Sequence, residues 1–431
     1  MQETERKNYV RHLTEMGEIH TIVAKDDILT TNGIKLISSG ARVNSSFYEK
    51  LIKHKLLIPI EESLNIKDCL THSILEEKAK ESIKTNGLLA SMQKNVSKGI
   101  LLHSFFSSLN IPDILLFKLT VLEKQLPIVF NHSLNVALAS IYIGLELNQN
   151  EETIKNIAIA GLFHDIGLLH IAIDLSDSNK ELNENDRKKI YSHPIIANLI
   201  LKTFPNYQVI SSAVMEHHER MDGSGYPQGL SGDQINIVGQ ILIVAELAIS
   251  LTEKKTNYGY INRLQAILKF NNNQYPHEIV KILLKLLKTI KNTTDNTTIS
   301  LTKKIFLNKL SSIWVVINAW DYKHDEGLGV PFEISNYISN RIEELTHALN
   351  MSGLTLSNIS LSDDDLNDIL NDAEEMLALI DEATYQLKNI YHEIIRRWPE
   401  RTSDEDTETS ITKWLVSIQK ILMELGEELK I

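Results

Sequence analysis

The chain has 431 residues, of which 43% are hydrophobic and 23% are charged, and its formal net charge is −12. This length exceeds one ordinary hydrophobic core and predicts two or three domains. The acidic balance argues against general binding to nucleic-acid polymers, which depends on clustered lysine and arginine, and the single cysteine, Cys69, excludes an internal disulfide framework and a cysteine-based metal cluster.

The N-terminal residues 1–17 mix charges of both signs and lack the apolar stretch of a secretory signal. No uninterrupted apolar run approaches the roughly 20 residues that a membrane-spanning helix requires. We therefore expect a cytoplasmic protein without a membrane span.

Residues 1–95 are expected to form a small mixed α+β domain. The segment ILTTNGIKLI (28–37) places Asn32-Gly33 between two short apolar-alternating runs, a pattern typical of a β-hairpin. From about residue 65 apolar residues recur at spacings of three and four, which indicates helices. We therefore expect a mainly α protein in which residues 96–290 form one all-α domain.

Residues 291–431 are expected to form a C-terminal helical region, which opens with a polar, Thr/Asn-rich boundary at 291–302. Further on, a regular apolar seam alternates steps of three and four; it consists of Leu366, Ile369, Ala373, Met376, Ile380, Ala383, Leu387, Ile390 and Ile394. The seam fits a coiled coil that forms a homodimer or carries a signal, or a bundle helix that packs on 331–349 and 408–429. We favour the bundle, because both flanking stretches are also amphipathic.

Five histidines and two carboxylates stand in contexts that favour one shared site. They are His132, His164, Asp165, His193, His217, His218 and Glu246. His164-Asp165 lies in the apolar stretch IAIAGLFHDIGLL, where a buried imidazole and carboxylate are costly unless a charged partner such as a metal ion pairs with them. Neighbours on a helix differ in direction by about 100°, so the doublets 164–165 and 217–218 suit two metals better than one. Taken singly, His132 or His193 would be an ordinary buried histidine.

The ligand types predict two divalent ions bridged by Asp165, with positions left open for substrate oxygens. Glu246 supports this prediction because it is a lone carboxylate in the apolar segment QILIVAELAIS. Imidazole and carboxylate without thiolate suit iron, manganese or zinc, and a nitrogen-rich bridged pair favours iron or manganese. A hydroxide held between two such ions is a nucleophile at neutral pH, so phosphoester hydrolysis is the expected reaction.

With these residues assembled, the chain resembles the HD-GYP family, a branch of the HD phosphohydrolase superfamily. HD corresponds to His164-Asp165 and GYP to Gly225-Tyr226-Pro227, within the signature FHDIG and the later EHHERMDGSGYPQGLSGDQI. The resemblance covers about 120–290. It implies an all-α bundle with a two- or three-metal centre that hydrolyses the bacterial second messenger cyclic di-GMP. The ligands carried over by position are those named above, with Glu246 where the family usually has aspartate.

The chain departs from the HD-GYP pattern at three further positions. Leu168 replaces the lysine of the usual HDIGK, which touches the substrate phosphate, and the form HDIGLLHI is associated with an atypical branch. Lys255 stands where arginine is common, which keeps the charge but loses the two-pronged guanidinium. Ile128 stands where some members carry a glutamate for a third metal, so we predict two metals.

The stretch HHERMDGSGYP is predicted to end a helix at its two histidines and then to turn, with Gly223 and Gly225 adopting positive φ. In the family this loop shapes the dinucleotide site. The expected substrate contacts are Tyr226, Lys255, Arg220, Gly225 and Pro227. The alternatives are that Tyr226 only braces the helix ends and that Arg220 is an ordinary ion-pairing residue.

The leading interpretation is a metal-dependent cyclic di-GMP phosphodiesterase in which a metal-bridging hydroxide attacks phosphorus. The alternative is a catalytically weak or inactive HD-GYP signalling module that retains metal and binds a dinucleotide or a protein partner. Loss of the lysine at position 168 favours the alternative, and the complete ligand set opposes it. A third interpretation is an HD hydrolase for another phosphoester, such as a hybrid cyclic dinucleotide.

Overall fold

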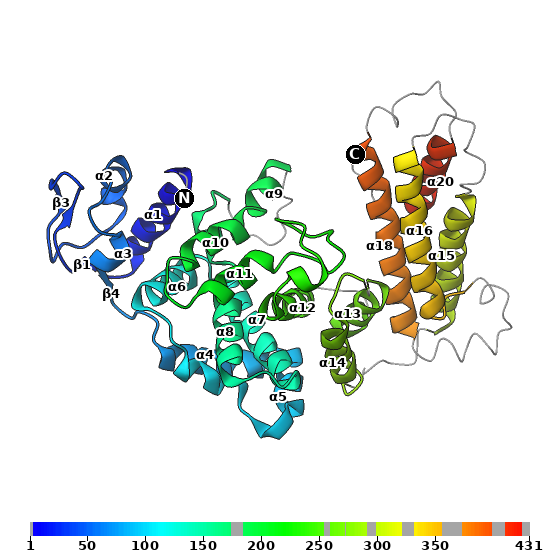
Figure 1. Cartoon of the computed structure of the whole chain (residues 1–431), viewed down its shortest axis with the longest axis horizontal. Helices are drawn as coiled ribbons and strands as arrows, with labels where there is room; N and C mark the ends of the chain where they lie inside the picture. The colour runs from blue at the N-terminus through cyan, green and yellow to red at the C-terminus, as the bar shows by residue number, and fades with distance from the viewer. Residues whose placement is uncertain are drawn as a thin grey trace. The chain divides into compact units, whose positions relative to one another are not determined.

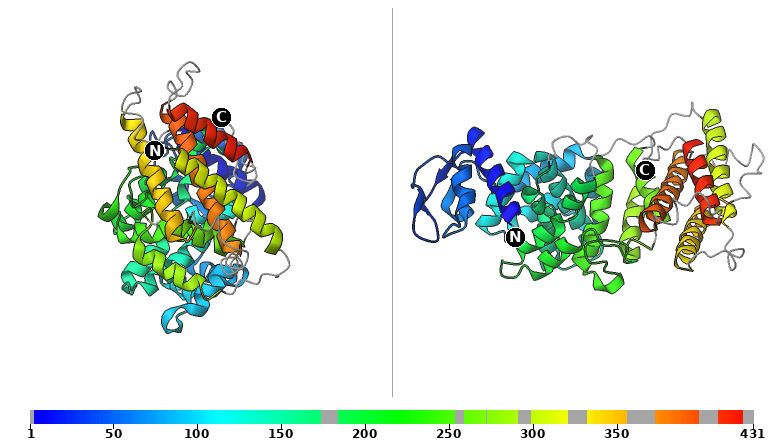
Figure 2. Two further views of the ribbon diagram at one scale, coloured as in Figure 1. Left: turned by 90° about the vertical axis from the view of Figure 1, so that its right-hand side faces the viewer. Right: turned by 90° about the horizontal axis from the view of Figure 1, so that it is seen from above.

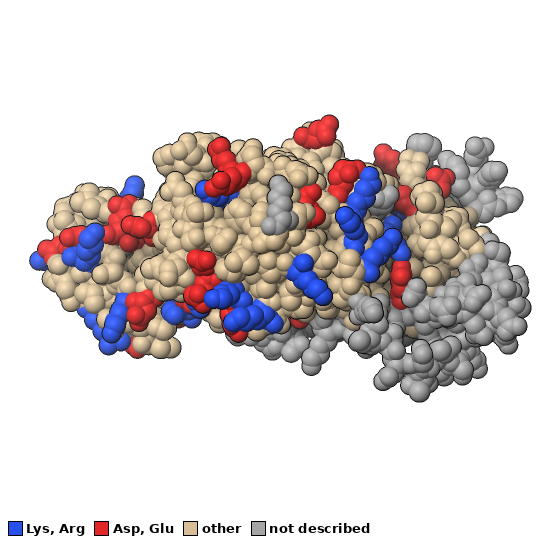
Figure 3. Space-filling model, turned by 90° about the horizontal axis from the view of Figure 1, so that it is seen from below, with Lys and Arg blue, Asp and Glu red and all other residues tan. Residues whose placement is uncertain are grey.

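The computed structural model describes residues 3–173, 184–253, 259–271, 273–290, 299–320, 332–355, 373–398 and 410–424. The described residues are mostly helical, and their few short strands lie near the N-terminus (Figure 1). The expected mainly α fold with a small N-terminal α+β part is therefore confirmed. On the face drawn in Figure 3, acidic and basic side chains of the described residues are interspersed.

The chain divides into two compact units. The first unit comprises 1–253 with 273–290, and the second comprises 254–272 with 291–431. This division differs from the three ranges expected from the sequence. The difference arises because the helix around residues 259–270 packs on the C-terminal helices, and because the N-terminal α+β part packs within the first unit.

The N-terminal part of the first unit combines helix α1 with two small antiparallel sheets. Its elements are α1 (Glu3–Ile19), β1 (Ile22–Ala24), β2 (Ile28–Leu29), β3 (Lys35–Ile37), η1 (Ser45–Phe47), α2 (Tyr48–Lys53), α3 (Ile60–Ser63) and β4 (Leu64–Ile66). β1 pairs with β4 and β2 with β3. The link between β2 and β3 turns at Gly33, whose φ of 79° lies in the region that favours glycine. The predicted hairpin at Asn32-Gly33 is confirmed.

The other described residues of the first unit are mostly helical. Their elements are α4 (His72–Thr85), α5 (Gly87–Asn95), η2 (Ser97–Gly99), η3 (Leu102–Ser108), α6 (Asp113–Gln125), α7 (Pro127–Glu146), α8 (Glu151–Phe163), η4 (Ile166–His170), α9 (Glu184–Ile190), α10 (His193–Leu201), α11 (Gln208–Glu216), η5 (Gly232–Gln234), α12 (Ile237–Thr252) and α14 (His277–Leu287). α7 packs against both α8 and α12. Gly161 permits the contact with α8, because a Cβ there would lie 2.6 Å from the Cα of Ala137 on α7. These three helices form the frame on which the site is built.

Helix α7 is, among the described residues, the one helix that is long and apolar enough to cross a membrane by length and composition. In the sequence, Asn131, His132 and Asn135 interrupt the apolar residues of this helix. It therefore contains no continuous apolar run long enough to predict a membrane span. Within the window that passes the test, 72% is buried inside the protein. The core helix of a soluble protein has the same properties, so α7 alone is weak evidence for a membrane span.

The second unit is a bundle of helices that share one hydrophobic core. Its elements are α13 (Gly259–Phe270), α15 (Ile299–Ala319), α16 (Phe332–Met351), α18 (Ala373–Arg397) and α20 (Ser410–Glu424). α15, α16, α18 and α20 run side by side (Figure 1 and Figure 2). Trp414 is buried in the core and donates a hydrogen bond from Nε1 to the carbonyl of Val316, at 2.9 Å.

The regular seam of the C-terminal region lies along α18. Ile380, Ala383, Leu387 and Ile390 are buried in the shared core, where α18 contacts α16 and α20. The preferred interpretation, a bundle helix that packs on the two flanking amphipathic stretches, is therefore confirmed. Leu366, Ile369 and residues 291–298 of the predicted boundary lie outside the described residues.

Candidate metal centre

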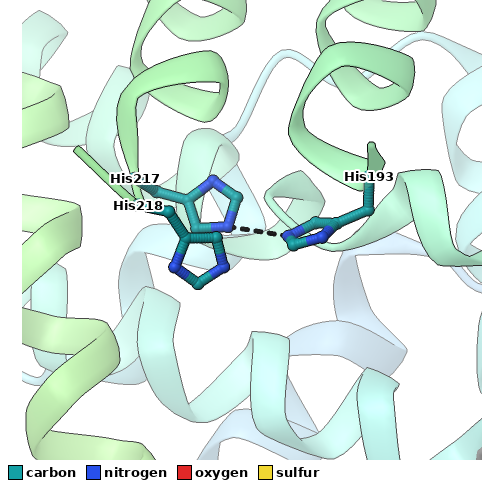
Figure 4. A group of neighbouring side chains, drawn as sticks. All are labelled: His193, His217 and His218. Carbon is teal, nitrogen blue, oxygen red and sulfur yellow. Dashed lines mark hydrogen bonds between the residues drawn. The ribbon is translucent and has the colours of Figure 1, made fainter. Parts of the chain in front are cut away.

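The side chains predicted as metal ligands lie together in the first unit. Their ligand atoms form three groups, in each of which all atoms lie within 4.8 Å of one another; the groups are His132, His164 and Glu246; His164, Asp165 and His217; and His193, His217 and His218. His164 and His217 each belong to two groups, so the cluster is continuous. Figure 4 shows the imidazoles of the third group facing one another.

Six helical segments supply these side chains, mostly from helix ends. The positions are His132 within α7, His164 at the C-cap of α8, Asp165 at the start of η4, His193 at the start of α10, His217 at the C-cap of α11 with His218 next to it, and Glu246 within α12. The prediction that the histidine doublet ends a helix is confirmed. A residue at a helix end leaves the regular 100° rotation, which lets both members of a doublet reach one cluster.

Asp165 lies between the two ends of the cluster. Its Oδ2 is 3.4 Å from Nε2 of His164, and its Oδ1 is 3.1 Å from Nε2 of His193. Burial would raise the pKa of Asp165, but the neighbouring His164 and His193 hold it well below its usual value. The carboxylate is therefore ionised and presents one oxygen to each side, which is the arrangement that a bridging ligand needs.

Three of the histidines are oriented in the same way by the backbone. In each, Nδ1 lies within hydrogen-bond distance of the carbonyl three residues earlier; the distances are 2.8 Å for His164, 2.6 Å for His193 and 2.5 Å for His217. A carbonyl only accepts, so the proton is held on Nδ1 and Nε2 is left for the cluster. The Nε2 of His164 is buried and has no hydrogen-bond partner among the described residues, which is the kind of atom that a metal ion would satisfy.

The two ends of the cluster differ in charge. Burial would lower the pKa of His164, but Asp165 and Glu246 outweigh it and raise the pKa to about 10. At the other end, burial and the neighbouring His193 lower the pKa of His218 to about 3. One end therefore holds protons that offset its carboxylates, whereas His217 and His218 at the other end are neutral imidazoles. Together these donors fit divalent cations that accept nitrogen and oxygen ligands.

Metal uptake is expected to release protons. The pKa of His132 and of His164 is raised mainly by carboxylates acting against burial, and a histidine nitrogen must lose its proton before it binds a cation. The apparent affinity for Mn²⁺ should therefore rise as the pH increases from 6 toward 9 and fall as the pH decreases. Calorimetric titration in two buffers of different ionisation enthalpy measures the released protons; uptake at pH 7 without proton release would contradict this prediction.

Two buried carboxylates beside the histidine doublet were not predicted from the sequence. Glu219 is fully buried, and its two oxygens accept hydrogen bonds from the backbone N–H groups of Gln228, at 2.7 Å, and Leu230, at 3.0 Å. Glu216 accepts from the backbone and side-chain nitrogens of Asn236, at 2.9 and 2.6 Å. These acids tie the doublet to the following loop and to the start of α12. The only sequence signal was an acid on each side of HH.

The loop after the doublet uses its glycines in two different ways. Gly223 has a φ of 78°, as predicted. The same expectation for Gly225 is wrong, since this residue is not in the positive-φ region. Glycine is required there for space, because a Cβ would lie 2.3 Å from the Cα of Glu219. The loop therefore folds back onto the chain directly after the doublet and places Tyr226 against the cluster.

Tyr226 reaches the cluster as the middle ring of an aromatic stack. Its ring lies 4.8 Å from that of His218, with an interplanar angle of 20°, and 4.6 Å from that of Tyr191, with an angle of 42°. Tyr191 is 52% exposed. Tyr191 was not among the predicted site residues. The feature of the sequence that could have indicated it is an aromatic residue two positions before His193. The stack leads from a ligand position to the protein surface.

The remaining predicted substrate contacts have varied outcomes. Arg220 donates from Nη1 to the carbonyl of Glu219, at 2.9 Å, and its guanidinium lies 5.3 Å from the ring centre of Tyr275. These contacts are a backbone hydrogen bond and a cation–π contact rather than an ion pair, and the expected contact of Arg220 with substrate stays a prediction. Gly225 and Pro227 flank Tyr226 in the loop, and Lys255 lies outside the described residues.

His170, which follows the HD doublet, points away from the cluster. Its ring stacks on Tyr9 of α1 with centroids 5.0 Å apart, and its carbonyl accepts a hydrogen bond from Asn8 at 3.0 Å. This histidine therefore joins the segment after Asp165 to the N-terminal helix.

Comparison with known proteins shows what the segment that carries the cluster is similar to. The family model described as an HD domain matches residues 119–276. A 3'3'-cGAMP-specific phosphodiesterase of Vibrio cholerae serotype O1 is 32% identical over 139 residues, which cover 32% of this chain and 32% of that protein. A cyclic di-GMP phosphodiesterase of Borreliella burgdorferi is 25% identical over 162 residues, which cover 37% of this chain and 42% of that protein.

A solved HDG"Y"P protein from Bdellovibrio bacteriovorus aligns over 62% of this chain and 95% of its own, with a TM-score of 0.34 and 15% identity. The chain thus spans less than half of the length of the two curated relatives described above. The predicted metal ligands, from His132 to Glu246, all fall within the matched residues. Residues 119–276 are therefore similar to the HD domain family over the part of the chain that carries the cluster.

Proposed function

We propose that this chain is a metal-dependent phosphodiesterase that hydrolyses a cyclic dinucleotide such as cyclic di-GMP. The observation that supports this most strongly is the carboxylate of Asp165, whose two oxygens face His164 and His193 from different groups of ligand atoms. The similar proteins of Vibrio cholerae and Borreliella burgdorferi are named as phosphodiesterases for 3'3'-cGAMP and cyclic di-GMP. Cyclic dinucleotides are therefore the substrate class that we favour.

Two divalent ions, iron or manganese, fit the donor set, because it combines imidazole and carboxylate without thiolate. One position would be held by His132, His164, Asp165 and Glu246. The other would be held by Asp165, His193, His217 and His218. When bound, such a pair supplies an activated water nucleophile and neutralises charge on a phosphoryl group.

The protein groups prepare the site before substrate arrives. Asp165 and Glu246 both have pKa values held well below the usual range, against the effect of burial, by the adjacent histidines. They therefore remain carboxylates at neutral pH. Burial and His218 lower the pKa of His217, so this ring remains a neutral donor. Fixed charges in a buried site stabilise a reacting phosphoryl group more than the same charges in water.

The neighbouring rings of Tyr226 and Tyr191 are proposed to receive a purine base of the dinucleotide. Stacking on an aromatic ring contributes about 1–3 kcal/mol per base. We expect Tyr191→Ala to raise KM about 10-fold with little change in kcat, and Tyr191→Phe to behave like the wild type. Steady-state kinetics test this, with Tyr385→Ala as control, since Tyr385 is similarly exposed on α18. An unchanged KM for Tyr191→Ala would exclude the stacking role.

The proposed reaction is tested by incubating protein loaded with Mn²⁺ or Fe²⁺ with cyclic di-GMP and, separately, with 3'3'-cGAMP. Chromatography should show the linear dinucleotide or mononucleotides, and the chelated protein should produce none. Binding of either nucleotide without turnover would instead support the signalling-module alternative. One observation favours that alternative: Leu168, at the position of the family's lysine, is 8% exposed and contributes no charge.

A further inference from the structure

His132 is held differently from the other histidines of the cluster. Its Nε2 lies 2.7 Å from Oε2 of Glu246, and its Nδ1 lies 2.8 Å from Oε2 of Glu253. His164, His193 and His217 instead direct Nδ1 to a backbone carbonyl. Of these four histidines of the described cluster, His132 is therefore the one whose Nδ1 lies beside a carboxylate.

Both carboxylates that hold His132 come from α12. Glu246 lies within this helix and Glu253 is its C-cap, seven residues later. Two helical turns span about seven residues, so both side chains lie on one face of the helix. The imidazole of His132, on α7, meets one carboxylate at each ring nitrogen. α12 thus supplies a ligand and, two turns later, a second acid that touches the same ring.

A carboxylate beside the ring nitrogen that does not bind the metal has a known physical effect on a metal-binding histidine. It accepts the Nδ1 proton, fixes the tautomer and the ring orientation, and makes Nε2 a stronger donor. Glu253 is 38% exposed and His132 is 11% exposed, so the contact forms at the edge of the site, where no neighbouring backbone carbonyl performs this role for His132 in the described residues. We propose that Glu253 is a positioning residue that orients His132 for the metal position formed with His164, Asp165 and Glu246.

An ordinary ion pair is the competing explanation, and it predicts the opposite sign. If Glu253 only stabilised a protonated His132, the proton would compete with the cation, and removal of Glu253 would strengthen metal binding. If Glu253 orients a neutral His132 through Nδ1, its removal weakens metal binding. The inference relies on the metal centre of the proposed function but not on the identity of the substrate.

To test this proposal, the metal-free full chain is titrated with Mn²⁺. Binding is measured by calorimetry and by the electron paramagnetic resonance signal of free Mn²⁺. We expect Glu253→Ala to weaken one of two equivalents about 10- to 100-fold and to leave the other unchanged. Glu253→Gln should have a smaller effect, because its amide oxygen still accepts from Nδ1. Glu278→Gln on α14 is the matched control, because Glu278 is exposed and pairs with Lys281.

A second measurement separates orientation from a general structural effect. In spectra of protein labelled with ¹⁵N-histidine, the hydrogen-bonded Nδ1–H of His132 should be lost in Glu253→Ala and retained in Glu253→Gln, while the corresponding signals of His164 and His217 persist. Thermal unfolding midpoints should match for both variants and the control. A collapse of all histidine signals in both variants would mean that Glu253 supports the fold and would overturn the positioning role.

The outcomes distinguish this inference from the proposed function. Wild-type affinity for both equivalents in Glu253→Ala, or tighter binding, would overturn the positioning role and leave the phosphodiesterase proposal intact. A wild-type chain that binds two ions but cleaves neither cyclic dinucleotide would overturn the phosphodiesterase proposal, while the titration would still decide the role of Glu253. A wild-type chain that takes up no metal would overturn both.

Discussion

Replacement of Asp165 by alanine is expected to lower cyclic dinucleotide hydrolysis by on the order of 1,000-fold or more. The carboxylate faces both His164 and His193, so its loss affects both proposed metal positions at once. It also removes the main counter-charge of His164, which is almost fully buried and whose pKa is about 10. Asp165→Asn should retain the shape of the side chain but lose the charge, and it should bind less metal than the wild type.

Product chromatography under excess Mn²⁺ measures the rate, and elemental analysis of dialysed protein measures the metal content. Asp233→Asn is a suitable control, since Asp233 is an exposed acid in η5 of the same unit. In both Asp165 variants, the turnover rate and the metal content should decrease together. Turnover within 10-fold of the wild type in Asp165→Ala would show that the reaction does not depend on this cluster.

Three of the predicted ligands, His164, Asp165 and Glu246, stand out in the sequence because their local contexts are unusual. His164-Asp165 lies in an apolar stretch and Glu246 lies in an apolar helix, so the cost of burying these polar groups is itself a sign that each has a partner. The hairpin at Asn32-Gly33 depends on two residues with strong local preferences. Features of this kind can be recognised in a single sequence, because each depends on residues that are close together along the chain.

Contacts between distant segments could not be inferred in the same way. Glu253 appears in the sequence as an ordinary acid at the end of a helix, and only the packing of α12 on α7 brings it to His132. Tyr191 likewise gains significance only when Tyr226 is folded against it. Gly225 was expected to adopt a positive φ, but glycine is required there because the Cα of Glu219 lies close to it. That close approach is a tertiary contact. In each case the sequence shows a common residue type, and the tertiary fold decides its role.

The second large effect is expected at Gly167, two residues after Asp165. Gly167→Ala should lower turnover at least about 100-fold and destabilise the first unit by about 1–3 kcal/mol. A Cβ at this position would lie 2.2 Å from the carbonyl oxygen of His193 and 3.0 Å from its Cα. Both neighbours are backbone atoms at the start of α10, so no side-chain rotation relieves the overlap. Either η4 or α10 must move.

Movement of either segment alters the cluster directly. Asp165 starts η4 and His193 starts α10, and the carboxylate oxygen and the imidazole nitrogen are now 3.1 Å apart. A backbone displacement large enough to admit a methyl group would separate these two atoms, and an error of about 1 Å in a reacting site can cost roughly 100-fold in rate. Glycine at position 167 is thus required by the proximity of two ligand segments.

Urea unfolding, turnover and Mn²⁺ titration should be measured together on Gly167→Ala. Gly33→Asn is the matched control, because Gly33 has open space around it and asparagine tolerates its positive φ. We expect Gly167→Ala to remain folded at low temperature and to lose more affinity at the position that contains His193 than at the position that contains His132. A variant with wild-type turnover and wild-type metal affinity would show that η4 and α10 can separate without moving Asp165 and His193.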